Sequence, residues 1–180
     1  SFTHDTMGCS PFTVPFSNNT IGAQSYQWTM DGTAYNSATP THVFNSLSQT
    51  DTVAVQMVAT SQYGCQDSLA SQVIVHHRAE ADFSTSASAS CTPAQITLTN
   101  NSNYYAQLAW DFDNGNTSNA VTPTLVTTLQ NALTVPDTHN IQLIAFTQHG
   151  CNDTAMVPVT VYPPITAGFT HDSVGCSPFT

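Results

Sequence analysis

Five cysteines are the residues of this chain that could form covalent cross-links. They occur in two contexts, a C-x-P motif at Cys9, Cys91 and Cys176 and a GC-x-D motif at Cys65 and Cys151. In a chain of extracellular character such thiols pair into disulfides, and an odd number leaves one without a partner inside the chain. We therefore interpret the cysteines as structural and not as nucleophiles.

A second set of residues could bind a metal ion. Asp111, Asp113 and Asn114 in the stretch WDFDNG carry oxygen atoms of the kind that Ca²⁺ prefers. The corresponding stretch in the first half of the chain keeps only Asp31, so the set is not repeated. Asp and Asn side chains also shape turns by hydrogen bonding to nearby backbone. We favour the turn role over a calcium site and expect no cofactor.

Catalytic chemistry has little support in the sequence. Serines and histidines are numerous, but none belongs to a nucleophile motif such as G-x-S-x-G. Neighbouring side chains of a strand point to opposite faces, so the adjacent His76 and His77 would not share a metal, and we interpret them as part of a solvated linker. The sequence predicts that this protein is not an enzyme.

Composition limits the partners of the chain. Its 180 residues contain a single strong base, Arg78, and the formal net charge is −10. Nucleic-acid binding requires clustered Lys and Arg to replace counterions, and an anionic membrane surface would repel this charge. No apolar run reaches the roughly 18 residues that span a bilayer. We expect an extracellular protein with neither nucleic-acid partners nor direct membrane insertion.

The chain is built from repeats. CSPFTVPFSNNT at Cys9 matches CTPAQITLTNNS at Cys91, and Trp28 and Trp110 follow these cysteines at the same spacing. FTHDSVGCSPFT at the end of the sequence repeats FTHDTMGCSPFT at its beginning. These matches predict a first domain at 1–79, a second at 80–165, and at 166–180 the first strand of a third repeat that resembles the first domain. We expect this pair of domains to be the unit of a longer array.

The hydrophobic pattern is that of strands. In SYQWTM (25–30) and QLAWDF (107–112), large apolar residues alternate with polar ones, which places one face in a core and one in solvent. Several such segments in each half, separated by clusters of Asn, Gly, Ser and Pro, predict an all-β fold of tandem β-sandwiches. The single Trp of each domain is expected to be the centre of its core.

The motif WDFDNG resembles the W-x-F-G-D-G motif of polycystic-kidney-disease (PKD) domains. The first domain departs from it, because WTMDG is one residue shorter and has Met in place of Phe. The combination with paired cysteines is similar to PKD repeats of large Bacteroidota cell-surface proteins, including gliding-motility adhesins. The resemblance implies immunoglobulin-like sandwiches of roughly seven strands that act as spacer or adhesive modules.

The topology implied by this resemblance bears on the disulfides. It places Cys9 and Cys91 near the turn after the first strand, and Cys65 and Cys151 in the last hairpin at the opposite end of each sandwich. Strands of ordinary length separate these ends by roughly 17–20 Å, whereas a disulfide needs Cα atoms within about 7 Å. The resemblance thus implies a Cys9–Cys151 bond across the domain junction. Cys65, Cys91 and Cys176 would then pair with repeats outside the sequence. Pairing within domains, Cys9–Cys65 and Cys91–Cys151, remains the alternative.

A further motif is associated with Bacteroidota O-glycosylation, namely Asp followed by Ser or Thr and then by an aliphatic residue, Met, Ala or Thr. It occurs at five acceptor residues: Thr6, Thr52, Ser68, Thr154 and Ser173. The alternative interpretation is that the Asp residues only cap turns.

We interpret the chain as a structural repeat segment of a long secreted bacterial cell-surface fibre or adhesin, stiffened by disulfides. Its expected partners are neighbouring repeats, copies of itself in a filament, and glycans. The alternative is a polysaccharide- or protein-binding accessory module of a secreted hydrolase. A flat row of exposed aromatic side chains would favour that alternative, and Tyr104 and Tyr105 are the adjacent pair in the sequence.

Overall fold

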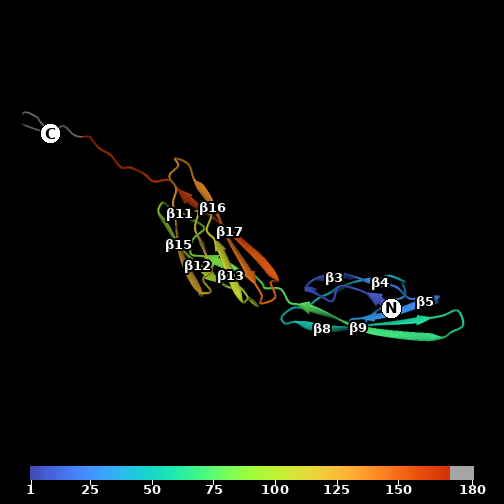
Figure 1. Ribbon diagram of the computed structural model, residues 1–180. Coiled ribbons are helices and arrows are strands. Elements are labelled where there is room, and N and C mark those ends of the chain that lie inside the picture. Colours follow the sequence, from blue (N-terminus) through green and yellow to red (C-terminus); the bar gives the residue numbers. More distant parts are fainter. Residues whose placement is uncertain (171–180) are drawn as a thin grey trace, which may run out of the picture.

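The computed structural model describes residues 1–170 as two β-sandwiches joined end to end (Figure 1). Each sandwich encloses its own cluster of buried hydrophobic side chains. Within residues 1–170 no helix could cross a membrane. The all-β, immunoglobulin-like fold predicted from the alternating pattern is confirmed.

The first sandwich has a five-stranded sheet of order β2-β9-β8-β5-β6, opposed by the pairs β1-β4 and β3-β7. Its strands are β1 (Phe2–Thr3), β2 (Met7–Cys9), β3 (Phe12–Pro15), β4 (Ser17–Asn18), β5 (Ser25–Met30), β6 (Thr33–Tyr35), β7 (Thr41–Phe44), β8 (Asp51–Thr60) and β9 (Gln66–His76). Cys65 lies in the turn of the long hairpin β8-β9, immediately before β9 begins.

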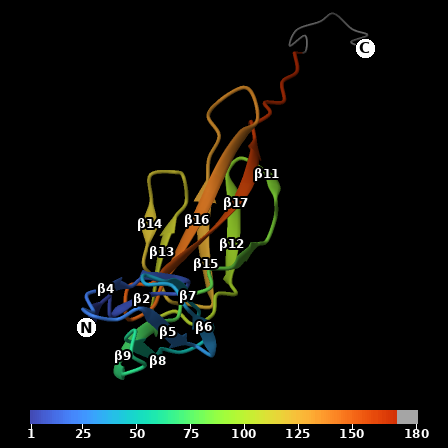
Figure 2. The ribbon, with the colours of Figure 1, turned by 90° about the vertical axis from the view of Figure 1, so that its right-hand side faces the viewer.

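The second sandwich repeats this plan with a five-stranded sheet of order β11-β17-β16-β13-β14 and a three-stranded sheet of order β10-β12-β15 (Figure 2). Its strands are β10 (Phe83–Thr85), β11 (Ala89–Cys91), β12 (Ala94–Asn100), β13 (Gln107–Asp111), β14 (Thr117–Ser118), β15 (Thr124–Leu129), β16 (Asp137–Phe146) and β17 (Asn152–Tyr162). The hairpin β16-β17 is the counterpart of β8-β9 and contains Cys151.

The first strand of each sandwich is divided between the two sheets. This division is absent from the expected sandwich of roughly seven strands. β1 and β10 pair antiparallel in one layer, whereas β2 and β11 pair parallel with the last strand in the other. The switch gives the last strand of each sandwich, β9 or β17, a second hydrogen-bonding neighbour in its sheet. In the first sandwich the switch brings the Phe12 ring so close to Gly8 that a Cβ there would lie 2.3 Å from it. Ser90 stands at the matching position in the second sandwich, where Ala94 replaces Phe12.

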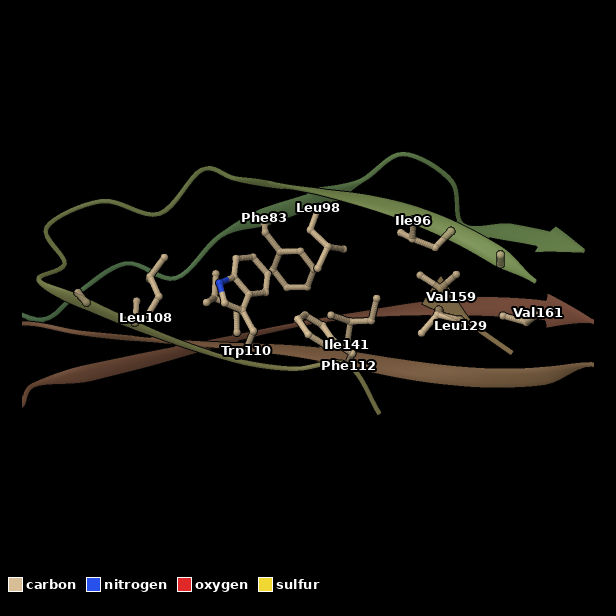
Figure 3. Close-up of a cluster of buried hydrophobic side chains, with 14 residues drawn as sticks. Phe83, Ile96, Leu98, Leu108, Trp110, Phe112, Leu129, Ile141, Val159 and Val161 are labelled. Carbon is tan, nitrogen blue, oxygen red and sulfur yellow. The ribbon is translucent and has the colours of Figure 1, made fainter. Parts of the chain in front are cut away.

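The two tryptophans are the centres of the cores, as predicted. Trp28 and Trp110 are buried, and each indole N–H donates to a backbone carbonyl, that of Ser37 at 3.1 Å and that of Ala120 at 3.3 Å. Figure 3 shows Trp110 beside Phe83, whose ring meets the indole edge to face with centroids 5.1 Å apart. The indole thus buries a large apolar area without leaving its polar atom unpaired.

The link between the sandwiches is short. β9 ends at His76 and β10 begins at Phe83, and Ala79 between them is buried in the second core. The domain boundaries of the sequence analysis stay predictions. The strand expected at 166–180 falls largely outside the described residues, and 166–170 form no strand.

Trp110→Ala should destabilise the second sandwich by about 3–5 kcal/mol, because it removes the largest side chain of that core and leaves a cavity. Guanidinium unfolding followed by circular dichroism would measure the effect. In this variant fluorescence comes from Trp28 alone and reports the first sandwich, whose midpoint should not change. Met156→Ala, at an exposed position, is the control and should change stability by no more than about 0.5 kcal/mol. Equal shifts of both sandwiches would contradict two separate cores.

Candidate functional site: the junction between the sandwiches

A disulfide joins the two sandwiches. Cys9, at the end of β2, is bonded to Cys151, at the tip of the β16-β17 hairpin, with an S–S distance of 2.01 Å and a Cα–Cα distance of 5.5 Å. This is the cross-junction pair expected from the immunoglobulin-like topology. Cys151 is buried, whereas Cys9 remains partly open to solvent.

The alternative pairs within domains are wrong for this structure. Cys9 lies beside His76 at one end of β9, and Cys65 precedes Gln66 at the other end. Ten residues of extended strand span about 33 Å, several times the reach of a disulfide. The same argument separates Cys91, beside Tyr162, from Cys151 at the opposite end of β17.

The linker is held against the second sandwich by polar contacts. The Arg78 guanidinium forms an ion pair with the Asp153 carboxylate at 2.9 Å and also donates to the carbonyl of Asn152. The other carboxylate oxygen of Asp153 accepts the backbone N–H of Ala81 at 3.0 Å. Both charged side chains are partly exposed, so the ion pair is worth at most about 1 kcal/mol and mainly fixes the direction of the linker.

A short antiparallel bridge extends this attachment. The N–H of Glu80 donates to the carbonyl of Asn103 at 3.0 Å, and the N–H of Asn103 donates back to Glu80 at 2.9 Å. The linker therefore docks as an added piece of strand on the loop that precedes β13.

Two histidines stack across the junction. The ring of His76 from the first sandwich lies on that of His149 from the β16-β17 hairpin, with centroids 3.9 Å apart and an interplanar angle of 16°. His76 Nδ1 lies 3.1 Å from the hydroxyl of Thr50. Burial lowers the pKa of His76, and the nearby imidazoles of His149 and His77 lower it further. The neutral form of His76 is therefore the one that fits the stack.

Sequence reasoning missed these contacts. The expectation that His76 and His77 belong to a solvated linker is wrong, because both are half-buried and the His77 ring meets that of Tyr104 edge to face. The sequence shows Arg78 as the single strong base but does not show its partner. The sequence signal that points to these contacts is Asp153, the Asp of the GC-x-D motif, because it closely follows Cys151, which is expected at the junction.

The described free cysteines mark the two outer ends of the sandwich pair. Cys65 and Cys91 are exposed thiols. Cys65 occupies in the β8-β9 hairpin the place that Cys151 has in β16-β17, and Cys91 ends β11 as Cys9 ends β2. Their pairing with other repeats stays a prediction. Cys176 lies outside the described residues.

The candidate calcium ligands are engaged in turn hydrogen bonds. Asp111 accepts the N–H of Asp113 at 2.9 Å, and the Asp113 carboxylate accepts the N–H of Asn140 at 2.8 Å. The Asn114 side chain donates to Thr128 and accepts from Asn116. Asp113 has a φ of 55°, a left-handed conformation that Asp tolerates in turns. Residues 1–170 contain no group of three acidic, His or Cys side chains placed to hold a metal.

The four described O-glycosylation candidates, Thr6, Thr52, Ser68 and Thr154, are all exposed. Ser173 lies outside the described residues. Two of the accompanying Asp residues have structural contacts, since Asp67 accepts the N–H of Ser68 at 2.9 Å and Asp153 binds the linker.

The adjacent tyrosines do not form a flat aromatic surface. Tyr104 is exposed, whereas Tyr105 packs against the second core and its hydroxyl receives a hydrogen bond from Asn100 at 2.9 Å. The two rings therefore cannot lie together on a polymeric ligand.

No known family model matches the chain, and no curated protein matches it significantly. Among solved structures, it is similar to the amphioxus IgVJ-C2 molecule (14% identity, 86% of this chain and 99% of that chain, TM-score 0.35). It is also similar to murine CEACAM1b (11%, 89% and 100%, TM-score 0.38) and to a Bacteroides ovatus protein of a mixed-linkage glucan utilization locus, SGBP-B (12%, 87% and 42%, TM-score 0.31). The immunoglobulin-like assignment rests on the strand order described above.

The histidine stack should make stability depend on pH. Because the pKa of His76 is lowered in the folded protein, the unfolded chain binds more protons as the pH falls through about 6.5. Stability should therefore be greatest above that pH and fall between pH 7.5 and 5.5. In His149→Phe, which keeps a ring but cannot be protonated, this fall should be smaller. Tyr63→Phe, at the matching hairpin position of the first sandwich, should behave like wild type. Identical pH profiles for all three proteins in urea unfolding would contradict the role of the stack.

Proposed function

We propose that this chain is a structural segment of a long secreted bacterial cell-surface fibre or adhesin, in which disulfides fix each domain to the next. The observation that carries the proposal is the Cys9–Cys151 bond, which joins one sandwich to the other. In a domain that works independently, the disulfide would instead link two cysteines of the same domain. A bond at this position prevents the two sandwiches from swinging apart about the linker.

The remaining contacts at the junction support the same function. A linker alone would allow hinge motion between domains, which is the usual behaviour of tandem modules. Here the disulfide, the Asp153 contacts and the histidine stack restrain the junction at separate points. Such redundancy suits a protein whose task is to hold a fixed spacing.

The cellular setting of the proposal comes from the resemblance to PKD repeats of Bacteroidota surface proteins. Exposed cysteines at both outer ends are compatible with a chain in which the same cross-link recurs between further repeats. O-linked glycans on the exposed candidates, Thr6, Thr52, Ser68 and Thr154, would cover the surface of such a fibre and are part of this proposal.

A disulfide map of the native material is the first test of the fibre proposal. Non-reducing proteolysis and mass spectrometry should recover the peptide of Cys9 bonded to that of Cys151, since the structure brings their Cα atoms to 5.5 Å. The same peptides should separate after reduction. A Cys9–Cys65 peptide would instead make each domain an independent bead and would remove the basis of the proposal.

The stiffness itself can be measured by small-angle X-ray scattering. The double variant Cys9→Ser, Cys151→Ser should give a broader distribution of distances between the sandwiches, because the linker alone is left to hold them. Cys65→Ser changes an exposed thiol away from the described junction and is the matched control. Scattering that is indistinguishable among wild type, double variant and control would show that the disulfide does not limit the motion.

A further inference from the structure

The outer end of the first sandwich carries a hollow next to Cys65. Residues that line it include Gly22, Ala23, Ser61, Cys65 and Asp67. In the second sandwich the matching positions are Tyr104, Tyr105, Thr147, Cys151 and Asp153, as the repeat alignment shows. There, this place receives the linker, because Asp153 binds Arg78 and Ala81 and Cys151 is bonded to Cys9.

The segment that leaves the second sandwich differs in size from that linker. VYPPITAGF begins at Val161 where VHHRAEADF begins at Val75, so Ile165 corresponds to Ala79. Ala79 is buried in the core of the following sandwich, whereas Ile165 is 97% exposed. The larger side chain would require a wider seat than Ala79 has.

The hollow of the first sandwich has that additional width. The second sandwich has two aromatic rings, Tyr104 and Tyr105, where the first has only Gly22 and Ala23. The small linker residue Ala79 adjoins Glu80, which pairs with Asn103 of the loop that carries the large side chains, and the large residue Ile165 matches a loop with small ones. In each combination a larger side chain on one partner meets smaller side chains on the other, which is the direction of change that close packing favours.

Both residues of the histidine stack are replaced by the same residue type at the equivalent positions of the outer ends. His76 stacks on His149, and the corresponding residues at the outer ends are Tyr162 and Tyr63. Both tyrosines are exposed, Tyr162 by 45% and Tyr63 by 83%. A junction formed from the outer ends would replace the histidine pair by a tyrosine pair, a combination that favours contact between rings.

From these matches we propose that the outer end bearing Cys91, Tyr162 and Ile165 binds the outer end bearing Cys65 and Tyr63 of a second copy of this unit. The array then has two alternating junctions, one with paired histidines and one with paired tyrosines, and each end accepts only its own type. This inference rests on the proposed function and adds to it the identity of the partner and the order of the repeats.

The tyrosine junction is closed by a disulfide between Cys91 and Cys65 of the next copy. Each thiol loses a proton as the S–S bond forms, and the two electrons pass to a disulfide oxidant. With oxidised glutathione as that oxidant, one new protein disulfide is formed for each pair of reduced glutathione molecules released.

The test uses residues 1–180 extended after Thr180 by a second copy of residues 14–168, which continues the third repeat into a full pair of domains. The protein is reduced and then reoxidised in a glutathione redox buffer. Non-reducing proteolysis with mass spectrometry should find Cys9 bonded to Cys151 and Cys91 bonded to the Cys65 of the second copy. The effective concentration of Cys91 at the Cys65 of the second copy is calculated from the fraction of this disulfide that forms at each ratio of oxidised to reduced glutathione.

The extended protein contains Tyr63 twice, so the same substitution can be made at the new junction as the test and away from it as the control. Tyr63→Ser in the second copy removes one ring of the new junction and should lower the effective concentration of the Cys91 disulfide by about 2- to 13-fold, the range for a lost aromatic pair. Tyr63→Ser in the first copy, away from this junction, should leave it unchanged. Ala23→Tyr in the second copy narrows the seat and should also lower it.

The outcomes separate this inference from the function on which it rests. Formation of Cys9–Cys151 without the Cys91 bond, or equal effects of Tyr63→Ser in both copies, would overturn the alternating junctions and leave the stapled segment intact. Failure of Cys9–Cys151 itself would count against the proposed function as well.

Discussion

Cα atoms joined by a disulfide must lie within about 7 Å of each other, and this limit determines how the two sandwiches meet. Cys9 can reach Cys151 only if the end of β2 lies against the tip of the β16-β17 hairpin. Because Cys9 and Cys151 are held together, the short linker between the sandwiches can follow only a narrow range of paths. The Arg78–Asp153 ion pair and the stack of His76 on His149 then form between groups that are already close together.

The interior of each sandwich is governed by a different requirement, which is to bury a large indole with its N–H paired. Both cores satisfy it in the same way, and both repeat a second contact behind the C-x-P turn. The Ser10 hydroxyl accepts the N–H of Ser46 at 2.9 Å, and that of Thr92 accepts the N–H of Asn131 at 3.0 Å. The scaffold is thus repeated, although the side chains that fill it differ between the two sandwiches.

Much of this architecture could be predicted because it depends on local patterns. The alternation around Trp28 indicated β5, and the repeat of GC-x-D placed Cys65 and Cys151 in equivalent hairpins. The partner of Cys9 required the order of strands, which came from the family resemblance. The histidine stack and the contacts of Asp153 could not be predicted, because they join residues far apart in sequence and depend on how one sandwich sits on the next. The division of the first strand around Gly8 was missed because it depends on the close approach of Phe12 in three dimensions.

The disulfide closes a loop with a sequence separation of 142 residues, so it also changes what a pulling force acts on. Tension that enters at the N-terminal end reaches Cys9 and crosses directly to Cys151. Trp28, Trp110 and the strands from β3 to β16 lie in the loop between these residues, outside the covalent path. A stretched chain would therefore carry covalent tension through the terminal segments that contain β1, β2 and β17, and the polypeptide between Cys9 and Cys151 would not be extended. A protease cut within the loop would leave the chain covalently continuous.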